Sequence, residues 1–407
     1  MFAINNNLGF KILIAVIILF LISFIFNNSY SLQNIDNLAY VVALGLDTSE
    51  NNNYKLTIQL AKPNNILSSS SSSSSEQSSS SVITSVDCSS IMEGINLIDS
   101  HISRTINLSH CEVIVISESL ARNDITQIIQ TLIDNIQIST HANMIFSKCD
   151  ASNYLELTNP TLESYSARYY HVINSSEIST AYTEAVSLMD FHSILNNNFQ
   201  EPVGVLSGIN TQLTHVNYSQ KSFANKDNSY IAGETPFTTN NHIENMGIAV
   251  FKDNKFVGEL NGLESICHLI TTGKLKYGII QINNPSNPSE LIDLKIQLRK
   301  KNKTSVEIIN NSPLIKQDIY LYIRIDDFFN DVNVYELEEY INSFTEDIIT
   351  NYLYKTAKVY NSDIDGFGKY ALKHFSTINE WENFNWLDNY QNSFFKVNVN
   401  SKIDIHQ

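Results

Sequence analysis

The pattern of apolar and polar positions sets the first 31 residues apart from the rest of the chain. An apolar run extends from Ile12 to Phe26 and contains no charge and one hydroxyl, Ser23. As a helix, residues 8–26 would be about 28 Å long, close to the roughly 30 Å of bilayer hydrocarbon. The sequence therefore predicts a membrane segment at 1–31. Its anchor residues would be Ile12, Leu13, Ile14, Val16, Ile17, Ile18, Leu19, Phe20, Leu21, Ile22, Phe24, Ile25 and Phe26.

The charge beside this run predicts on which side of the membrane the chain lies. Lys11 flanks the N-terminal end, and the positive-inside bias then places everything from Asn27 onward outside the cytoplasm. A cleaved secretory signal is the alternative, because Ser29–Ser31 supplies small residues behind the apolar run. Both readings export the rest of the chain. The earliest cysteine is Cys88, so no cysteine directly behind the run is available to carry a lipid.

Residues 32–200 have the pattern of an α/β domain. The alternating stretches Ala39–Leu46 and Tyr54–Leu60 predict a hairpin, and Ser68–Ser81 predicts a flexible serine-rich loop between strands. Helices and strands then alternate, with Asn123 placed to cap the middle helix. The expected elements are Ser89–His101, Cys111–Ile116, Asp124–Ile136, Ala142–Ser147 and Ala151–Leu157.

Two further domains are expected. Residues 201–272 would form a small middle domain around a β-hairpin at 247–260, with a turn at Asp253-Asn254, a short helix at 263–271 and a polar loop at 217–241. Residues 273–407 predict a C-terminal antiparallel sheet plus helices, including a long helix with an apolar stripe from Leu337 to Leu353. The expected fold class is α+β or mixed α/β, with three exported domains whose mixed sheets are packed by helices. The five C-terminal strands would be Gly278–Ile282, Leu291–Leu298, Ser305–Ile309, Ile319–Ile325 and Phe395–Ile403.

Composition narrows the possible partners. The chain has 26 basic and 42 acidic residues and a formal charge of −16, which argues against binding nucleic acid. A basic cluster at 299–303 lies between two predicted strands and is read as a solvated hairpin tip, with a docking patch as the alternative. The four cysteines, Cys88, Cys111, Cys149 and Cys267, have no metal-site spacing, and their disulfide state is left open.

The search for catalytic motifs finds no nucleophile elbow, no zinc-protease motif and no P-loop. The segment 361–372 supplies oxygen side chains and a glycine as in a calcium loop, but its last position is Leu372 rather than a bidentate Glu. It also matches a dinucleotide fingerprint in letters only. We interpret it as a tight glycine turn between helices, with Asp363 or Asp365 as a cap and a positive φ at Gly366 or Gly368. No cofactor, metal or catalytic residue is predicted.

Four blocks of sequence resemble the Ger(x)C proteins, the C subunits of nutrient germinant receptors in spore-forming bacteria. The first is the opening hairpin, and the second surrounds the strand that follows His110. The third is the hairpin at 249–260, and the fourth is the turn at 365–368 with a tryptophan downstream. The residues that carry the last three blocks are Arg104, His110, Glu118, Phe251, Gly258, Glu264, Asp365, Gly366, Gly368 and Trp381.

The resemblance implies a three-domain, non-catalytic subunit attached to the spore inner membrane. Its partners would be a multi-pass A-type subunit and a transporter-like B-type subunit, and direct contact with the nutrient is left open. The family is typically lipid-modified at a cysteine that this chain lacks, so the apolar segment itself would be the anchor. An exported envelope hydrolase and a surface scaffold or adhesion protein are the alternative functions.

Overall fold

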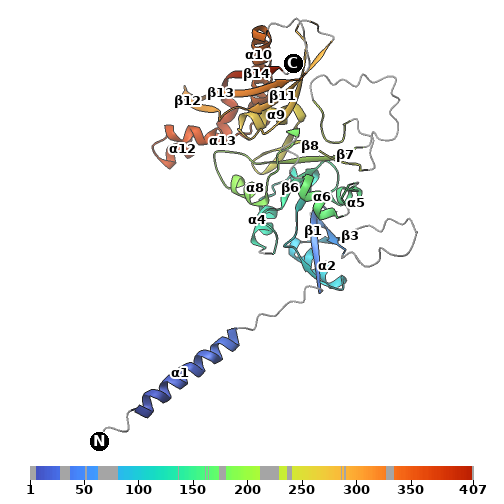
Figure 1. Cartoon of the computed structure of the whole chain (residues 1–407), viewed down its shortest axis with the longest axis vertical. Coiled ribbons are helices and arrows are strands. Elements are labelled where there is room, and N and C mark those ends of the chain that lie inside the picture. The colour runs from blue at the N-terminus through green and yellow to red at the C-terminus, as the bar shows by residue number, and fades with distance from the viewer. Residues whose placement is uncertain are drawn as a thin grey trace, which may run out of the picture. The chain divides into compact units, whose positions relative to one another are not determined.

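The structure is a computed structural model of the whole chain (Figure 1). It describes residues 6–27, 37–50, 53–62, 81–135, 137–160, 162–163, 165–173, 180–210, 229–235, 241–285, 287, 290–326 and 334–405. The chain forms two compact units, Met1–Leu38 and Ala39–Gln407. The serine-rich loop lies outside the described residues up to position 80, as does most of the polar loop at 217–241.

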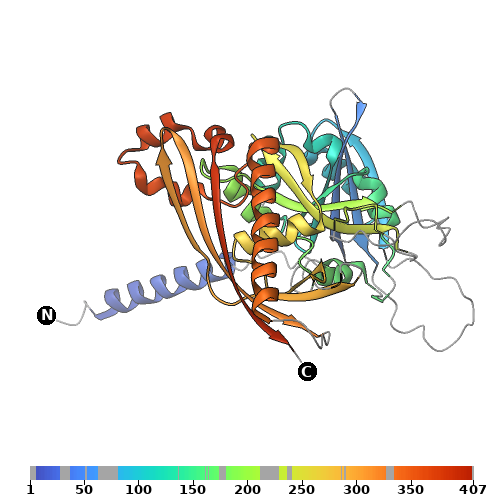
Figure 2. The same cartoon turned by 90° about the horizontal axis from the view of Figure 1, so that it is seen from above.

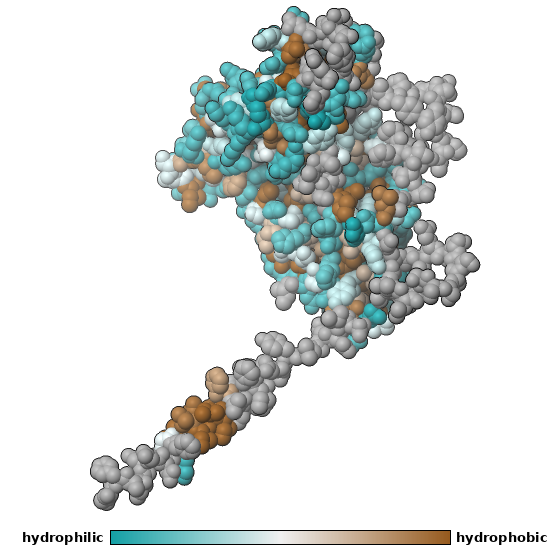
Figure 3. Space-filling view, in the orientation of Figure 1, coloured by the Kyte–Doolittle hydropathy of each residue, from teal (hydrophilic) through white to brown (hydrophobic). Residues whose placement is uncertain are grey.

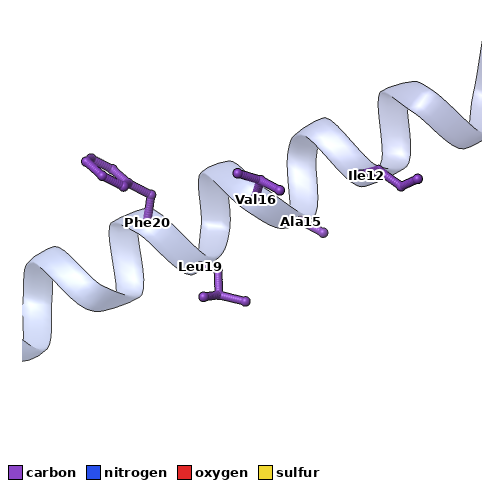
Figure 4. Close-up of a pocket in the computed structure, with 5 residues that line it drawn as sticks. All are labelled: Ile12, Ala15, Val16, Leu19 and Phe20. Carbon is purple, nitrogen blue, oxygen red and sulfur yellow. The ribbon is translucent and has the colours of Figure 1, made fainter.

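The first unit contains helix α1 (Asn6–Asn27). Its apolar side chains from Ile12 to Phe20 are exposed, and Figure 4 shows five of them projecting from the helix. The side chains of the anchor residues from position 21 onward lie outside the described residues. Among the helices that the structure describes, none meets both the length and the apolar character needed to cross a membrane. The membrane segment stays a prediction.

The second unit begins with a nine-stranded sheet in the order β3-β2-β1-β5-β6-β7-β8-β9, with β4 paired to β1. The central strands β1, β5, β6 and β7 run parallel, and the predicted opening hairpin is confirmed as antiparallel β1 and β2. The strands are β1 (Leu38–Thr48), β2 (Tyr54–Ala61), β3 (Ser81–Cys88), β4 (Thr105–Asn107), β5 (Val113–Ser117), β6 (Asn143–Ser147), β7 (Val203–Ile209), β8 (Ile243–Lys252) and β9 (Lys255–Leu260).

Helices bury both faces of this sheet, as the continuous apolar pattern of its central strands requires. One apolar cluster takes side chains from α2 (Ile91–His101), α4 (Thr126–Asp134) and α8 (Leu188–Leu195). A second cluster, on the alternate strand positions, takes them from α5 (Ala151–Leu157) and α6 (Ser166–Ile173). The α/β pattern predicted for this part of the chain is therefore confirmed.

Three details of this sheet differ from the sequence interpretation. Strands β4 and β7 were not predicted, because β4 has only three residues and Gly204, Ser207 and Gly208 leave β7 without period-two alternation. Asn123 does not cap α4, since its side chain donates to Ser119 O and Asp124 instead accepts the Thr126 N–H at 2.9 Å. The hairpin predicted at 247–260 is confirmed as β8 and β9, with positive φ at Asp253 and Asn254, and it continues the same sheet.

A second sheet of five strands forms the C-terminal part of the chain (Figure 2). Its antiparallel strands are β10 (Gly278–Asn283), β11 (Leu291–Leu298), β12 (Lys303–Ile309) and β13 (Ser312–Ile325). The fifth strand, β14 (Phe394–Ile405), pairs with β13 in parallel, so the expectation of an antiparallel sheet is wrong for this strand. The chain returns from β13 to β14 through helices, and such a crossover allows parallel pairing.

Helices connect and cover the second sheet. The long helix α10 (Val334–Lys355) continues as a π-helical turn, η5 (Thr356–Tyr360), and α9 (Gly262–Thr271) lies before the sheet in the chain. The largest apolar cluster contains side chains from both sheets, so they share one core. The remaining short helices are α3 (Glu118–Ala121), α11 (Gly368–Ala371), η6 (Leu372–His374), α12 (Ile378–Phe384), α13 (Trp386–Asn389) and η7 (Tyr390–Asn392).

Strand β14 lies at the edge of the second sheet, where β13 is its one partner among the strands that the structure describes. The Val399 N–H donates to Glu346 Oε1 at 2.7 Å, and the Ser401 N–H donates to Asn342 Oδ1 at 3.0 Å. Both acceptors belong to α10, so helix side chains bind backbone groups on the open edge of the strand. Elsewhere in the unit, all four cysteines are free thiols.

Candidate functional site

The predicted glycine turn lies between η5 and α11. Gly366 has a φ of +71°, which confirms one of the two predicted positions, and a Cβ there would lie 2.7 Å from Gln200 Oε1. Gly368 has no such φ, but a Cβ on it would lie 2.4 Å from Phe199 O. Backbone conformation therefore requires the first glycine, and a close approach of another backbone segment requires the second.

Asp363 holds the turn from inside. Its carboxylate accepts the N–H of Phe367 at 3.0 Å, the N–H of Gly368 at 2.8 Å and the indole N–H of Trp386 at 2.7 Å. The predicted capping role is thus confirmed for Asp363. Burial raises the pKa of this carboxyl to about 7, although the three N–H donors act in the opposite direction.

Asp365 points into a different set of partners, a buried polar cluster that we call the His268 cluster. Its buried members are His268, Glu184, Asp365 and Tyr352, and Lys274, whose side chain is 53% exposed, contacts Glu184 from the surface. His268 Nε2 lies 2.7 Å from Glu184 Oε2, and its Nδ1 lies 2.9 Å from the Tyr352 hydroxyl. The Tyr352 hydroxyl donates to Asp365 Oδ2 at 2.9 Å. Lys274 donates to Glu184, and Thr271 donates to Asp365.

Charge pairing sets the protonation of the His268 cluster. Burial alone would lower the pKa of His268, but the Glu184 charge and the hydrogen bond to Asp365 outweigh it and raise the pKa to about 9. Burial alone would raise the pKa of Glu184, but the charges of His268 and Lys274 lower it to about 2. At neutral pH the imidazole is therefore charged and donates from both nitrogens, to Glu184 and to Tyr352.

The cluster joins segments that lie far apart in the sequence. Glu184 precedes α8, His268 is on α9, Tyr352 is on α10, and Asp365 is in the glycine turn. The side chains of His268, Asp365 and Glu184 are 1%, 0% and 5% exposed. Each polar group is thus paired within the protein, and the cluster connects the first sheet's helices to those of the second.

Several residues of the family-like blocks surround this junction. Gly258 lies directly under the Tyr360 ring, since a Cβ would come within 2.2 Å of it. Glu264 forms a capping box with Asn261 and an ion pair with Lys355 at 2.8 Å. Phe251 belongs to an aromatic group of the shared core, and its carbonyl accepts from Ser362. Trp381 stacks on Trp386, the donor to Asp363.

The three residues of the second block have other neighbours. Arg104 is exposed ahead of β4, and His110 packs edge-on against the Tyr40 ring with centroids 5.0 Å apart. Glu118 pairs with Arg122 one turn along α3. The structure therefore assembles the third and fourth blocks at one junction and leaves these three residues elsewhere.

Sequence reasoning missed His268 and Glu184. The available signal was a histidine within the apolar stretch Ile266–Ile270, a position that is buried on any helix. Asp363 and Asp365 face different partners, so they do not converge on one point as calcium ligands would. Among the residues that the structure describes, no group of three or more His, Cys, Asp or Glu side chains could hold a metal ion.

Comparisons with known proteins agree with this architecture. Residues 31–206 match the spore germination protein N-terminal domain, and residues 246–406 match the spore germination B3/GerAC like, C-terminal domain. The chain is 21% identical over 195 residues to spore germination protein KC of Bacillus subtilis (strain 168), a match that covers 47% of this chain and 48% of that protein, about half its length. The crystal structure of the GerBC protein has the same fold, with a TM-score of 0.52 at 15% identity, over 88% of this chain and 96% of that chain. With both domain models matched in order, the chain belongs to the Ger(x)C family of germinant receptor C subunits.

Proposed function

We propose that this chain is a membrane-attached, non-catalytic subunit of a nutrient germinant receptor, acting with A-type and B-type subunits during spore germination. The observation that carries the proposal is the ordered match of both domains over most of the exported chain. It would lie in the spore inner membrane with the bulk of the chain outside the cytoplasm. The proposal assigns no nutrient-binding role to this subunit.

The geometry of the His268 cluster supports a structural role. His268, Glu184, Asp365 and Tyr352 are buried and bonded to one another, so a substrate would have to displace these partners before reaching them. The same contacts join α9, α10 and the glycine turn. We assign the family-like residues around the junction, from Phe251 to Trp381, to holding the two sheets in one body.

Attachment is proposed through α1. Its side chains from Ile12 to Phe20 are apolar and exposed, with Phe20 73% accessible, and such a surface needs a partner that excludes water. The mature protein should therefore retain its N-terminus and carry no acyl chain. Intact-mass measurement of the protein from the membrane fraction tests this point, and a soluble mature chain that begins near Leu32 would contradict it.

A complementation experiment tests the receptor role. Spores that lack this protein should fail to germinate on one class of nutrient, and the full chain should restore the response. A chain with residues 1–31 replaced by a cleavable signal should be exported but should not restore it. In mild detergent the full chain should copurify with A-type and B-type subunits. Normal nutrient germination without this protein would refute the receptor role.

A further inference from the structure

One face of the C-terminal sheet has a charge opposite to that of the whole chain. The helices pack against the face on which Ile315, Ile319 and Ile323 are buried, and the alternate positions point outward. We call these outward positions, with the β11–β12 connection and Asp326, the basic face. Figure 3 shows a hydrophilic area where Figure 1 labels β12 and β13. Its charged residues are Lys295, Arg299, Lys300, Lys301, Lys303, Lys316, Arg324, Lys396 and Lys402, with Asp293, Glu307, Asp318, Asp326 and Asp404.

This distribution is uneven for so acidic a chain. The basic face has nine basic and five acidic residues, an excess of four positive charges, although the whole chain carries −16. The rest of the chain therefore carries −20 and repels anions. Among the described residues of the C-terminal sheet, this face alone presents positive charge on an extended and regular array of side chains.

Each of the five acidic residues on the face has a partner within the protein, a cation for two of them and a neutral donor for three, one of which is Asp293, bonded to the Gln281 amide at 2.8 Å. Glu307 lies 2.6 Å from Lys316 Nζ, and Asp326 pairs with both Lys295 and Arg324. Asp318 accepts from Asn398 at 2.9 Å, and Asp404 accepts from Tyr322 at 2.5 Å.

The lysines that remain are open to an outside anion. Lys303, Lys396 and Lys402 are exposed, and within the described part of the chain none of them has an acid at ion-pair distance. Such lysines can bind an external anion without first breaking an internal pair.

The composition of the basic face favours lipid headgroups over a protein partner. The face lacks the arginine enrichment of protein interfaces, since seven of its nine basic residues are lysines, about the same share as in the whole chain. Lysine is a compact charge on a flexible stem, which suits phosphates that are not fixed in position. Tyr320, Tyr322 and the exposed Phe394 add aromatic rings of the kind found at membrane interfaces.

We propose that the basic face binds the anionic phospholipid headgroups of the membrane to which the chain is attached. This inference rests on the proposed attachment through α1, because a tether keeps the face at high effective concentration near the bilayer. It extends the sequence interpretation of 299–303 from a solvated hairpin tip to one edge of a larger surface.

Lysine acetylation on the full chain tests the proposal. The protein is reconstituted in vesicles of phosphatidylcholine, with or without phosphatidylglycerol, and acetylation rates are read by mass spectrometry. Lys303, Lys396 and Lys402 should react about tenfold more slowly in anionic vesicles and recover in about 1 M salt, where charges are screened beyond about 3 Å. The exposed lysines Lys255, Lys369 and Lys373 serve as internal controls. Each should react at the same rate in both kinds of vesicle and at low and high salt.

A charge variant separates lipid binding from other protection. In K303Q/K396Q/K402Q, anion-dependent protection of Lys300 and Lys301 should be lost, whereas the matched control K255Q/K369Q/K373Q should keep it. Equal rates in both kinds of vesicle would overturn the proposal. Slow acetylation of the face lysines in vesicles of pure phosphatidylcholine would also overturn it and would indicate that a second copy covers the face. Slow acetylation only after A- or B-type subunits are added would overturn it in favour of a protein partner. If the chain does not stay with vesicles after an alkaline wash, attachment through α1 fails instead, and vesicles added from outside still test the face.

Discussion

The His268–Glu184 pair predicts how the stability of the protein depends on pH. Folding raises the pKa of His268 from 6.5 to about 9. A base whose pKa is raised by folding contributes its full stabilisation below pH 6.5 and loses it as the pH rises through about 9. The difference between the two pKa values corresponds to about 3 kcal/mol of unfolding free energy. Glu184 behaves in the opposite direction, since its contribution is lost only as the pH falls through about 2.

Glu184→Gln is the perturbation that isolates this contribution. It keeps the shape of the side chain but removes the charge that most strongly raises the pKa of His268. At pH 6.5 we expect a loss of about 3 kcal/mol, within the range for breaking a buried ion pair. For a unit of this size that loss lowers the melting temperature by about 4 °C. Between pH 6.5 and about 9, the unfolding free energy of the variant should fall by at most half as much as that of the wild type.

Equilibrium unfolding of the full chain in detergent at several pH values measures both quantities. Glu259→Gln is the matched control, because Glu259 forms a partly exposed ion pair with Lys148 at 3.2 Å and should cost at most about 1 kcal/mol. A wild-type protein equally stable at pH 6.5 and 9 would refute the reasoning. So would a Glu184→Gln variant whose stability falls as steeply as that of the wild type.

Three further predictions concern the turn and the serine loop. Gly366→Ala should cost about 2 kcal/mol, about 1 kcal/mol more than Gly273→Ala, because both glycines have positive φ but a Cβ at Gly273 meets no atom within 4 Å; equal losses in urea unfolding would show that the Gln200 contact is unimportant. Asp363→Asn should cost about 2 kcal/mol rather than the smaller loss of an exposed cap, since an amide cannot accept all three N–H donors; tryptophan fluorescence reports the change at Trp386, and a loss near zero would contradict it. Shortening the serine tract at 68–80 to a few residues should leave the melting temperature almost unchanged, because loop-closure entropy changes only logarithmically with length; a large drop would mean that the tract packs.

Local sequence patterns predicted most of the helices and strands but not which strands pair or in which direction. Alternation along Phe395–Ile403 predicted a strand, yet alternation is the same in parallel and antiparallel neighbours, so the direction of β14 relative to β13 could not be read. Strand β7 is buried on both faces and contains glycine, which removes the period that marks a strand. In contrast, the turn at Asp253-Asn254 was predictable because its residue types tolerate positive φ.

The candidate site was predictable only in part, for a similar reason. The positive φ of Gly366 and the hydrogen bond from Phe367 to Asp363 are local to the turn, so a local motif was enough to indicate a glycine turn with a carboxylate cap. The His268 cluster takes Glu184, His268, Tyr352 and Asp365 from segments up to 181 residues apart, counting from 184 to 365. No spacing rule connects such positions, and the charge of the buried imidazole depends on a carboxylate that folding alone brings near it.

The contacts between α10 and the edge of β14 affect how easily the second sheet can pair with a strand of another molecule. An open strand edge can recruit a strand from a neighbouring molecule and start aggregation. Here Glu346 and Asn342 already occupy two outward backbone N–H groups in the middle of the edge, so an incoming strand would have to displace a helix side chain at each. Pairing of β14 with a strand of another molecule is therefore disfavoured at these two positions, without any loss of pairing inside the sheet.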